Sequence, residues 1–129
     1  KEVADWDRTK GHDKMQSLLQ ANPNLNGVIS GNDEMALGAI AALKEAGKLE
    51  GVVVGGFDGS PDAVAAVESG ELAYTVLQPV AVFSKEAVAL ADAFIRTGEA
   101  PETEKQSFDC ILITKDNVDK MTAPFTYEG

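Results

Sequence analysis

The chain has 129 residues, of which 44% are hydrophobic, and this is enough for one globular domain with a core. Its 21 acidic and 11 scattered basic residues give a formal charge of -10, which excludes a nucleic-acid partner because phosphate binding needs clustered Lys and Arg. Cys110 is the only cysteine and no apolar stretch reaches about 18 residues, so an internal disulfide, a cysteine-based metal site and membrane insertion are not expected.

The first half of the chain predicts two helices with a short strand between them. Residues 1–6 show neither an initiator methionine nor a signal-peptide pattern, so we expect a processed or truncated chain. A first helix is predicted over 10–21, and its inward positions are Met15, Leu18 and Leu19, with Gln16 as a fourth candidate. Residues 27–30 follow as a buried strand. A second helix, capped by Asn32 or Asp33 and closed by Gly47, carries an apolar stripe of Ala36, Leu37, Ile40 and Leu43.

The second half continues the alternation. Residues 51–57 form a β-branched run typical of a parallel strand covered on both faces. Ser60 and Pro61 then begin a third helix that ends near Gly70. A strand is predicted over 72–78, a longer helix over 82–96, a last strand over 107–113, and a short helix or turn over 115–121. The buried side of the longer helix is expected to carry Phe83, Ala87, Leu90, Ala91 and Phe94, while the tail after Pro124 has no periodicity.

Strands and helices in alternation predict the α/β class, with a parallel sheet and helices on both of its faces. Such a sheet needs cover on both sides. Any missing part would therefore leave strand edges and helix faces exposed.

Four residues suited to ligand contact stand at the ends of successive strands. Asn32 follows the first strand, Asp58 follows the second and Gln78 ends the third. Trp6 follows a short segment that would suit the tail of a strand entering from outside this chain. Because ligands of open α/β sheets bind outside the carboxyl ends of the strands, we expect these side chains to converge at one edge.

The side-chain types favour a polyhydroxylated ligand. The Asp58 carboxylate can accept hydrogen bonds from two neighbouring hydroxyls, and its charge strengthens both. Asn32 and Gln78 each offer an acceptor and two donors, and Trp6 offers a flat apolar wall. Each residue also has a plainer interpretation: Asn32 as a helix cap, Asp58 as a turn residue, Trp6 as core and Gln78 as an ordinary loop residue.

Four segments around these residues resemble a known family. They are Ala4–Arg8, Asn32–Gly38 (Asn-Asp-Glu-Met-Ala-Leu-Gly), Val54–Asp62 and Leu72–Pro79. In order and spacing they are similar to periplasmic sugar-binding proteins of ABC transporters, of the ribose-binding type, and the likeness extends through nearly the whole chain. The resemblance implies that Trp6, Asn32, Asp58 and Gln78 contact the sugar or polyol, with no cofactor, no bound metal and no catalytic residue.

The resemblance also implies a partial type I periplasmic-binding-protein fold. Such proteins have two lobes joined by a three-strand hinge, close over the ligand in the periplasm and dock on an ABC permease. Residues 1–77 would be part of the carboxyl-terminal lobe, 78–81 the hinge crossing, 82–114 a segment packing on the absent amino-terminal lobe, and 115–129 a return segment and tail. By itself the chain would need that missing lobe or a second copy of the fragment, or would expose apolar helix faces.

Three other function classes remain to be weighed. A sugar-responsive transcription repressor uses the same two-lobe core, but residues 68–72 and the strand before Gln78 look more like the transport proteins. An enzyme is disfavoured because Gly55–Gly59 lacks dinucleotide or Walker spacing, and His12 beside Asp13 suits a solvated surface. The acidic run 99–104 could serve a protein-interaction module, although charge runs are usually solvated loops.

Overall fold

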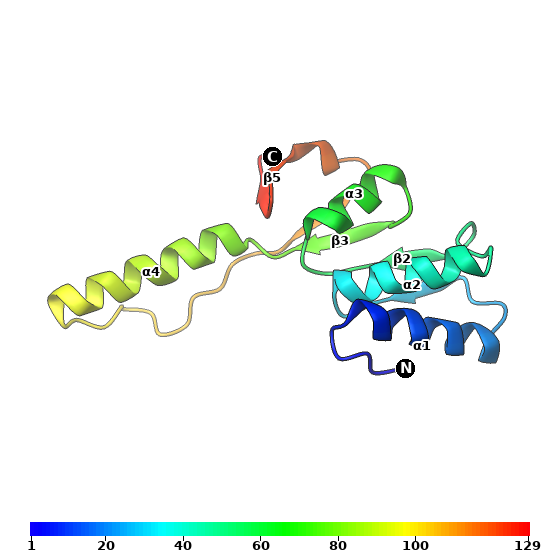
Figure 1. Ribbon diagram of the computed structural model, residues 1–129. Helices are drawn as coiled ribbons and strands as arrows, with labels where there is room; N and C mark the ends of the chain where they lie inside the picture. The colour runs from blue at the N-terminus through cyan, green and yellow to red at the C-terminus, as the bar shows by residue number, and fades with distance from the viewer.

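The computed structural model describes residues 1–129 and confirms the predicted alternation of helices and strands (Figure 1). Its elements in chain order are α1 (Arg8–Ala21), β1 (Gly27–Ile29), α2 (Asp33–Glu45), β2 (Val53–Gly55), α3 (Pro61–Ser69), β3 (Tyr74–Leu77), α4 (Val80–Thr97), β4 (Ile111–Thr114), the 3₁₀ turn η1 (Val118–Lys120), β5 (Met121–Ala123) and β6 (Thr126–Tyr127). The helix ends lie close to their signals: Ser60 caps α3 and accepts from the Ala63 amide, and Gly70 ends it in the left-handed conformation.

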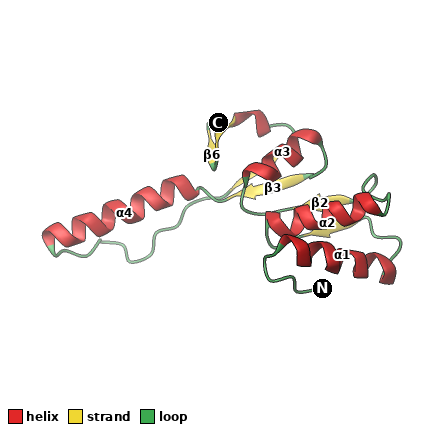
Figure 2. Cartoon of the chain, in the orientation of Figure 1, coloured by secondary structure: helices red, strands yellow, loops and turns green.

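Four strands form one mixed sheet in the order β1-β2-β3-β4. The first three are parallel, as predicted, but β4 runs antiparallel to β3, with Ile111 opposite Leu77 and Thr114 opposite Tyr74. The sheet is therefore mostly parallel, and the prediction of a parallel sheet fails only for β4. The reason is visible in Figures 1 and 2: α4 leads away from the body, and the chain returns through a loop to the end of the sheet that it left. A strand that re-enters from that end must run in the opposite direction.

Only one face of this sheet is covered. The buried strand residues Val54, Thr75 and Ile113 lie on the face that α2 and α3 contact. Side chains alternate along a strand, so their neighbours point the other way: Ile29, Val53 and Leu112 are 87%, 58% and 54% exposed. The expectation of helices on both faces is thus wrong for this chain, because nothing within residues 1–129 packs on the second face.

The core lies between that covered face and the helices. Met15 and Leu19 of α1, Leu43 of α2 and Val67 of α3 belong to one buried cluster, whereas Gln16 points into solvent. Two glycines, Gly11 in α1 and Gly38 in α2, let the two helices approach closely. A Cβ on Gly38 would collide with the backbone carbonyl of Arg8. This close contact holds the start of α1, and the turn before it, against the start of α2.

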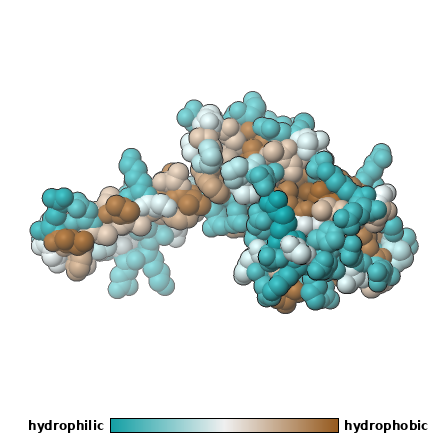
Figure 3. All heavy atoms as spheres, in the orientation of Figure 1, coloured by the Kyte–Doolittle hydropathy of each residue, from teal (hydrophilic) through white to brown (hydrophobic).

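Helix α4 stands apart from the body and buries none of its residues (Figure 1). The predicted buried side is therefore exposed or only half-buried in this chain: Phe83 and Leu90 are half-buried, and Phe94 is 50% exposed. Figure 3 shows hydrophobic and polar groups side by side along this projecting helix. The expected exposure of an apolar helix face is confirmed. No helix here has the length and hydropathy needed to cross a membrane.

The tail contains a small hairpin that the sequence did not predict. Strands β5 and β6 pair antiparallel, with Met121 opposite Tyr127, and turn through Phe125 at a φ of 57°. Strands of two or three residues are too short to show a period of two, so periodicity could not find them. The predicted short helix or turn before the hairpin is confirmed as η1.

Candidate functional site

The loops that follow β1, β2 and β3 are hydrogen-bonded into one edge. The backbone amide of Asp33 donates to the carbonyl of Phe57 at 2.8 Å, which joins the first loop to the second. The amide of Asp58 donates to the carbonyl of Val76 at 2.8 Å, and the amide of Gln78 donates to the carbonyl of Asp58 at 3.1 Å. The predicted convergence of Asn32, Asp58 and Gln78 on one sheet edge is therefore present in the backbone.

Asp58 and Gln78 form the first pair of this edge. The Gln78 side-chain amide donates to Oδ1 of Asp58 at 2.6 Å, and both residues are half-buried. Burial raises the pKa of the Asp58 carboxyl above its usual value, although the bond from Gln78 opposes the shift. A carboxylate has about four lone-pair positions, so this bond leaves capacity to accept hydroxyl protons.

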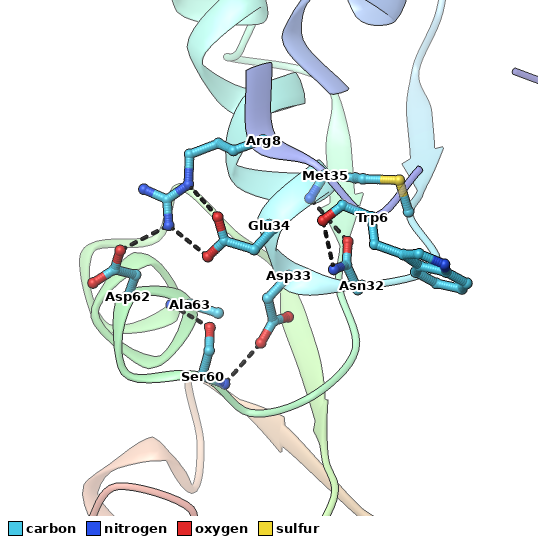
Figure 4. Close-up of polar contacts among 9 residues, drawn as sticks. All are labelled: Trp6, Arg8, Asn32, Asp33, Glu34, Met35, Ser60, Asp62 and Ala63. Atoms are coloured by element: carbon cyan, nitrogen blue, oxygen red, sulfur yellow. Dashed lines mark hydrogen bonds and ion pairs between the residues drawn. The ribbon is translucent and has the colours of Figure 1, made fainter. Parts of the chain in front are cut away.

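Asn32 and Trp6 form the second pair, drawn in Figure 4. Oδ1 of Asn32 accepts from the Met35 amide at 3.0 Å, so the helix-cap interpretation holds, while Nδ2 donates to the Trp6 carbonyl at 3.2 Å. The Trp6 side chain is 67% exposed, which rules out the core interpretation in this chain. Its ring lies over Gly31, where a Cβ would stand 3.0 Å from ring atom Cζ3. The edge thus carries an open aromatic surface.

Arg8 joins the first turns of three helices beside this edge (Figure 4). Its Nε and Nη2 donate to the two carboxylate oxygens of Glu34 at 2.8 Å each, and Nη2 also donates to Asp62 at 2.8 Å. These bonds, chiefly those that Arg8 donates to Glu34, raise the pKa of the guanidinium. Sequence analysis did not identify this contact. The acidic first turns of α2 and α3 were the available signal, since both helices begin at the same sheet edge.

Asp33 is a second residue that sequence analysis missed in this role. It is fully buried, and its carboxylate accepts from the Thr75 hydroxyl at 2.7 Å and from the Ser60 amide at 2.8 Å. Its sequence position next to Asn32 suggested only an alternative helix cap. The structure instead connects α2 to β3 and to the loop that carries Asp58.

A hollow lies beside this edge. It has a volume of about 610 Å³ and is bounded by the amino-terminal segment, α1 and β1. Trp6 lines it, but Asn32, Asp58 and Gln78 do not. The structure therefore brings the four predicted residues together as two hydrogen-bonded pairs on an open edge, without enclosing them in a cavity. A ligand held here would need a second surface opposite the edge.

Known proteins resemble this chain over most of its length. A family model described as a periplasmic binding protein domain matches residues 1–100. The D-apiose import binding protein of Actinobacillus succinogenes is 51% identical over 123 residues, which cover 93% of this chain and 39% of that protein. The ribose import binding protein of Salmonella typhimurium is 46% identical over 112 residues, covering 87% of this chain and 37% of that protein. The chain thus spans about two fifths of the length of these relatives.

A solved structure shows the same architecture. It is an ABC transporter periplasmic solute-binding protein from Actinobacillus succinogenes with bound D-allose. The structural match has a TM-score of 0.83 and 31% sequence identity, and covers 90% of this chain and 40% of the other.

Proposed function

The chain belongs to the periplasmic binding protein domain family, and we propose that it is part of the substrate-binding component of an ABC transporter. The family is one of binding and transport proteins and is not an enzyme family. The whole protein would capture a sugar or polyol in the cleft between two lobes, in the periplasm, and deliver it to the permease. The repressor alternative is not favoured, since the relatives are named as import binding proteins.

The observation that carries this proposal is the paired arrangement at the sheet edge. Asp58, which accepts a hydrogen bond from Gln78, offers charged acceptors for sugar hydroxyls. Asn32 lies in the loop after β1, which the Asp33 amide joins to the loop that carries Asp58. Trp6 presents an exposed ring at the same edge. In the proposed site the ring covers the C–H face of the ligand, while the three polar side chains bind its hydroxyls.

The exposed surfaces suggest how the chain sits in the whole protein. We assign residues 1–77 to the carboxyl-terminal lobe and 78–81 to the hinge crossing. Of the segment 82–114 expected on the amino-terminal lobe, α4 lies away from the body, whereas β4 pairs with β3 inside it. The segment that we propose to pack on the amino-terminal lobe therefore ends before β4. Residues 115–129 form the return segment and tail.

A thermal-shift panel tests the proposal with the full-length protein. D-apiose, D-ribose and D-allose are the probes, and at least one is expected to raise the melting temperature, because a ligand at 100 times its Kd adds about 2.7 kcal/mol to the free energy of unfolding. D-ribose 5-phosphate serves as the control, since the edge carries Asp58 and offers no free cation. No shift with any neutral sugar or polyol would contradict the proposal.

Replacing Trp6 by alanine is expected to weaken sugar binding about tenfold, because losing a ring contact worth about 1.4 kcal/mol raises the Kd by a factor of about ten. The melting temperature of the sugar-free protein should stay nearly unchanged, since the ring is largely exposed. Calorimetry and thermal unfolding measure the two quantities, and Trp6→Phe, which retains a ring, is the matched control. A large loss of stability with unchanged affinity would instead assign Trp6 to the packing of the whole protein.

A further inference from the structure

Asp33 is a buried carboxylate without a cationic partner. Its side chain has no exposed surface, and no lysine, arginine or histidine forms an ion pair with it. Its carboxylate oxygens accept from a neutral hydroxyl, that of Thr75, and from a backbone amide, that of Ser60. Burying an uncompensated carboxylate costs free energy, and apolar packing between α2 and the sheet does not require one.

The groups bound by Asp33 surround Asp58 in the sequence. The Asp33 backbone amide donates to the carbonyl of Phe57, the residue before Asp58. One carboxylate oxygen, Oδ2, accepts from the amide of Ser60, two residues after it. The other, Oδ1, accepts from the Thr75 hydroxyl, whose oxygen in turn accepts from the Gly59 amide at 3.0 Å. Asp33 thus holds backbone groups on both sides of Asp58: its backbone amide binds the carbonyl before Asp58, and its side chain, directly and through the Thr75 hydroxyl, binds the two amides after it.

Asp58 needs such support because of its backbone conformation. Its φ is 132°, a region that a residue with a side chain adopts only when the surrounding contacts enforce it. Space for adjustment is small: a Cβ on Gly56 would collide with Oδ1 of Asp33, and a Cβ on Gly59 would stand 2.6 Å from Leu77. The loop is therefore packed directly on the Asp33 carboxylate and on β3.

We infer that Asp33, through Thr75, is a positioning residue that sets the direction of the Asp58 carboxylate toward Gln78 and the ligand. This inference rests on the proposed function. Asp33 is itself fully buried, so its side chain is not accessible to a ligand. Asp33 fixes the loop so that the Asp58 carboxylate meets the sugar hydroxyls without rearrangement. Such preorganisation increases affinity, because the loop need not be ordered when the sugar binds.

Variants of the full-length protein test the inference. Thr75→Val removes the hydroxyl at nearly constant shape, Thr75→Ser keeps the hydroxyl, and Asp33→Asn keeps the shape while removing the charge. We expect Thr75→Val and Asp33→Asn to weaken binding of whichever panel sugar binds the unmodified protein by about tenfold or more, as loss of an orienting partner does at metal sites. Thr75→Ser and the control Glu102→Gln, at an exposed position outside the site, should stay within about threefold, as surface substitutions usually do.

A second measurement needs no ligand. In the sugar-free protein, the NMR signals of the Gln78 side-chain amide and the hydrogen exchange of the Gly59 amide report on the loop directly. Both should change in Thr75→Val and Asp33→Asn, and remain near those of the unmodified protein in Thr75→Ser. If Asp33→Asn fails to fold, the two Thr75 variants still decide the result.

The outcomes separate this inference from the proposed function. If no panel sugar binds the unmodified protein, the proposed function fails, and the Gln78 and Gly59 signals alone decide whether Asp33 positions the loop. If sugars bind, but Thr75→Val and Asp33→Asn bind within about threefold of the unmodified protein, the positioning role is overturned and Asp33 serves only the stability of the lobe. Equal losses in Thr75→Ser, which keeps the hydroxyl, and in Thr75→Val, which lacks it, would also overturn it, because the loss of affinity would then not depend on the hydroxyl.

Discussion

Replacing Asp58 by alanine in the full-length protein is expected to weaken sugar binding about 100-fold or more, since the sugar hydroxyls would be buried without their charged acceptor. The effect is the largest we expect at the site, because Asp58 is the one carboxylate among the four proposed contacts and already holds Gln78. Removing it also frees the Gln78 amide that it binds. Titration calorimetry with the sugar selected by the thermal-shift panel measures the change.

Two further variants define the origin of that loss. Asp58→Asn keeps an acceptor and tolerates the positive φ better than alanine, so it should bind more weakly than the unmodified protein and more tightly than Asp58→Ala. Glu102→Ala removes an exposed carboxylate from the loop between α4 and β4 and should change neither affinity nor stability. If the Kd of Asp58→Ala for the sugar stays within about threefold of that of the unmodified protein, the scale of a surface substitution, then Asp58 does not belong to the site.

The charge on Asp58 also predicts a pH dependence. Burial raises the pKa of this carboxyl above its usual value in the folded chain. As the pH falls through that raised pKa, the group gains a proton and loses charge-assisted acceptance, so sugar affinity should decline at a higher pH than for an ordinary aspartate. Asp58→Asn should lack this step.

Replacing Gly38 by alanine is expected to lower the free energy of unfolding by about 1–3 kcal/mol, the usual cost of overpacking a close contact. Alanine is the better helix former by about 1 kcal/mol, so helix propensity alone predicts the opposite sign. The difference arises because the new Cβ would meet the backbone carbonyl of Arg8, and would stand 2.8 Å from the amide nitrogen of His12. Backbone atoms of α1 cannot rotate away as a side chain can.

Ala41→Gly is the matched control for this prediction. Ala41 is exposed on the same helix, so its replacement reports helix propensity without an interhelical contact. Denaturant unfolding of the full-length protein measures both variants, and both should be destabilised. Stabilisation by Gly38→Ala would mean that α1 and α2 separate without cost. Because α1 follows the turn that carries Trp6, displacement of α1 by Gly38→Ala should also weaken sugar binding.

Much of the fold could be predicted from local chemistry. Ser60 with Pro61 and Gly70 marked both ends of α3, because capping and left-handed termination depend only on the residues at the ends. The apolar stripe of α2 and the β-branched run of β2 likewise signalled their elements. Their alternation implied that Asn32, Asp58 and Gln78 would reach one edge, since parallel strands end on the same side.

Which surfaces this chain leaves uncovered could not be predicted in the same way. An apolar helix face predicts that something covers it, but not where the covering part lies in the chain. For α4 and for the face carrying Ile29 and Val53, nothing within residues 1–129 does so. The antiparallel direction of β4 follows from the same fact, because α4 does not pack back on the sheet as a crossover helix would.

The sequence by itself predicted the α/β class, the order of the elements from α1 to β4, and the positions of Asn32, Asp58 and Gln78 after successive strands. Only the tertiary structure decided which side chains meet there: Gln78 with Asp58, Asn32 with Trp6, and the buried Asp33 with Thr75 and Ser60. Periodicity and capping are properties of neighbouring residues. The bond between Asp33 and Thr75 joins residues 42 apart in sequence, and such a contact exists only after the strands have paired.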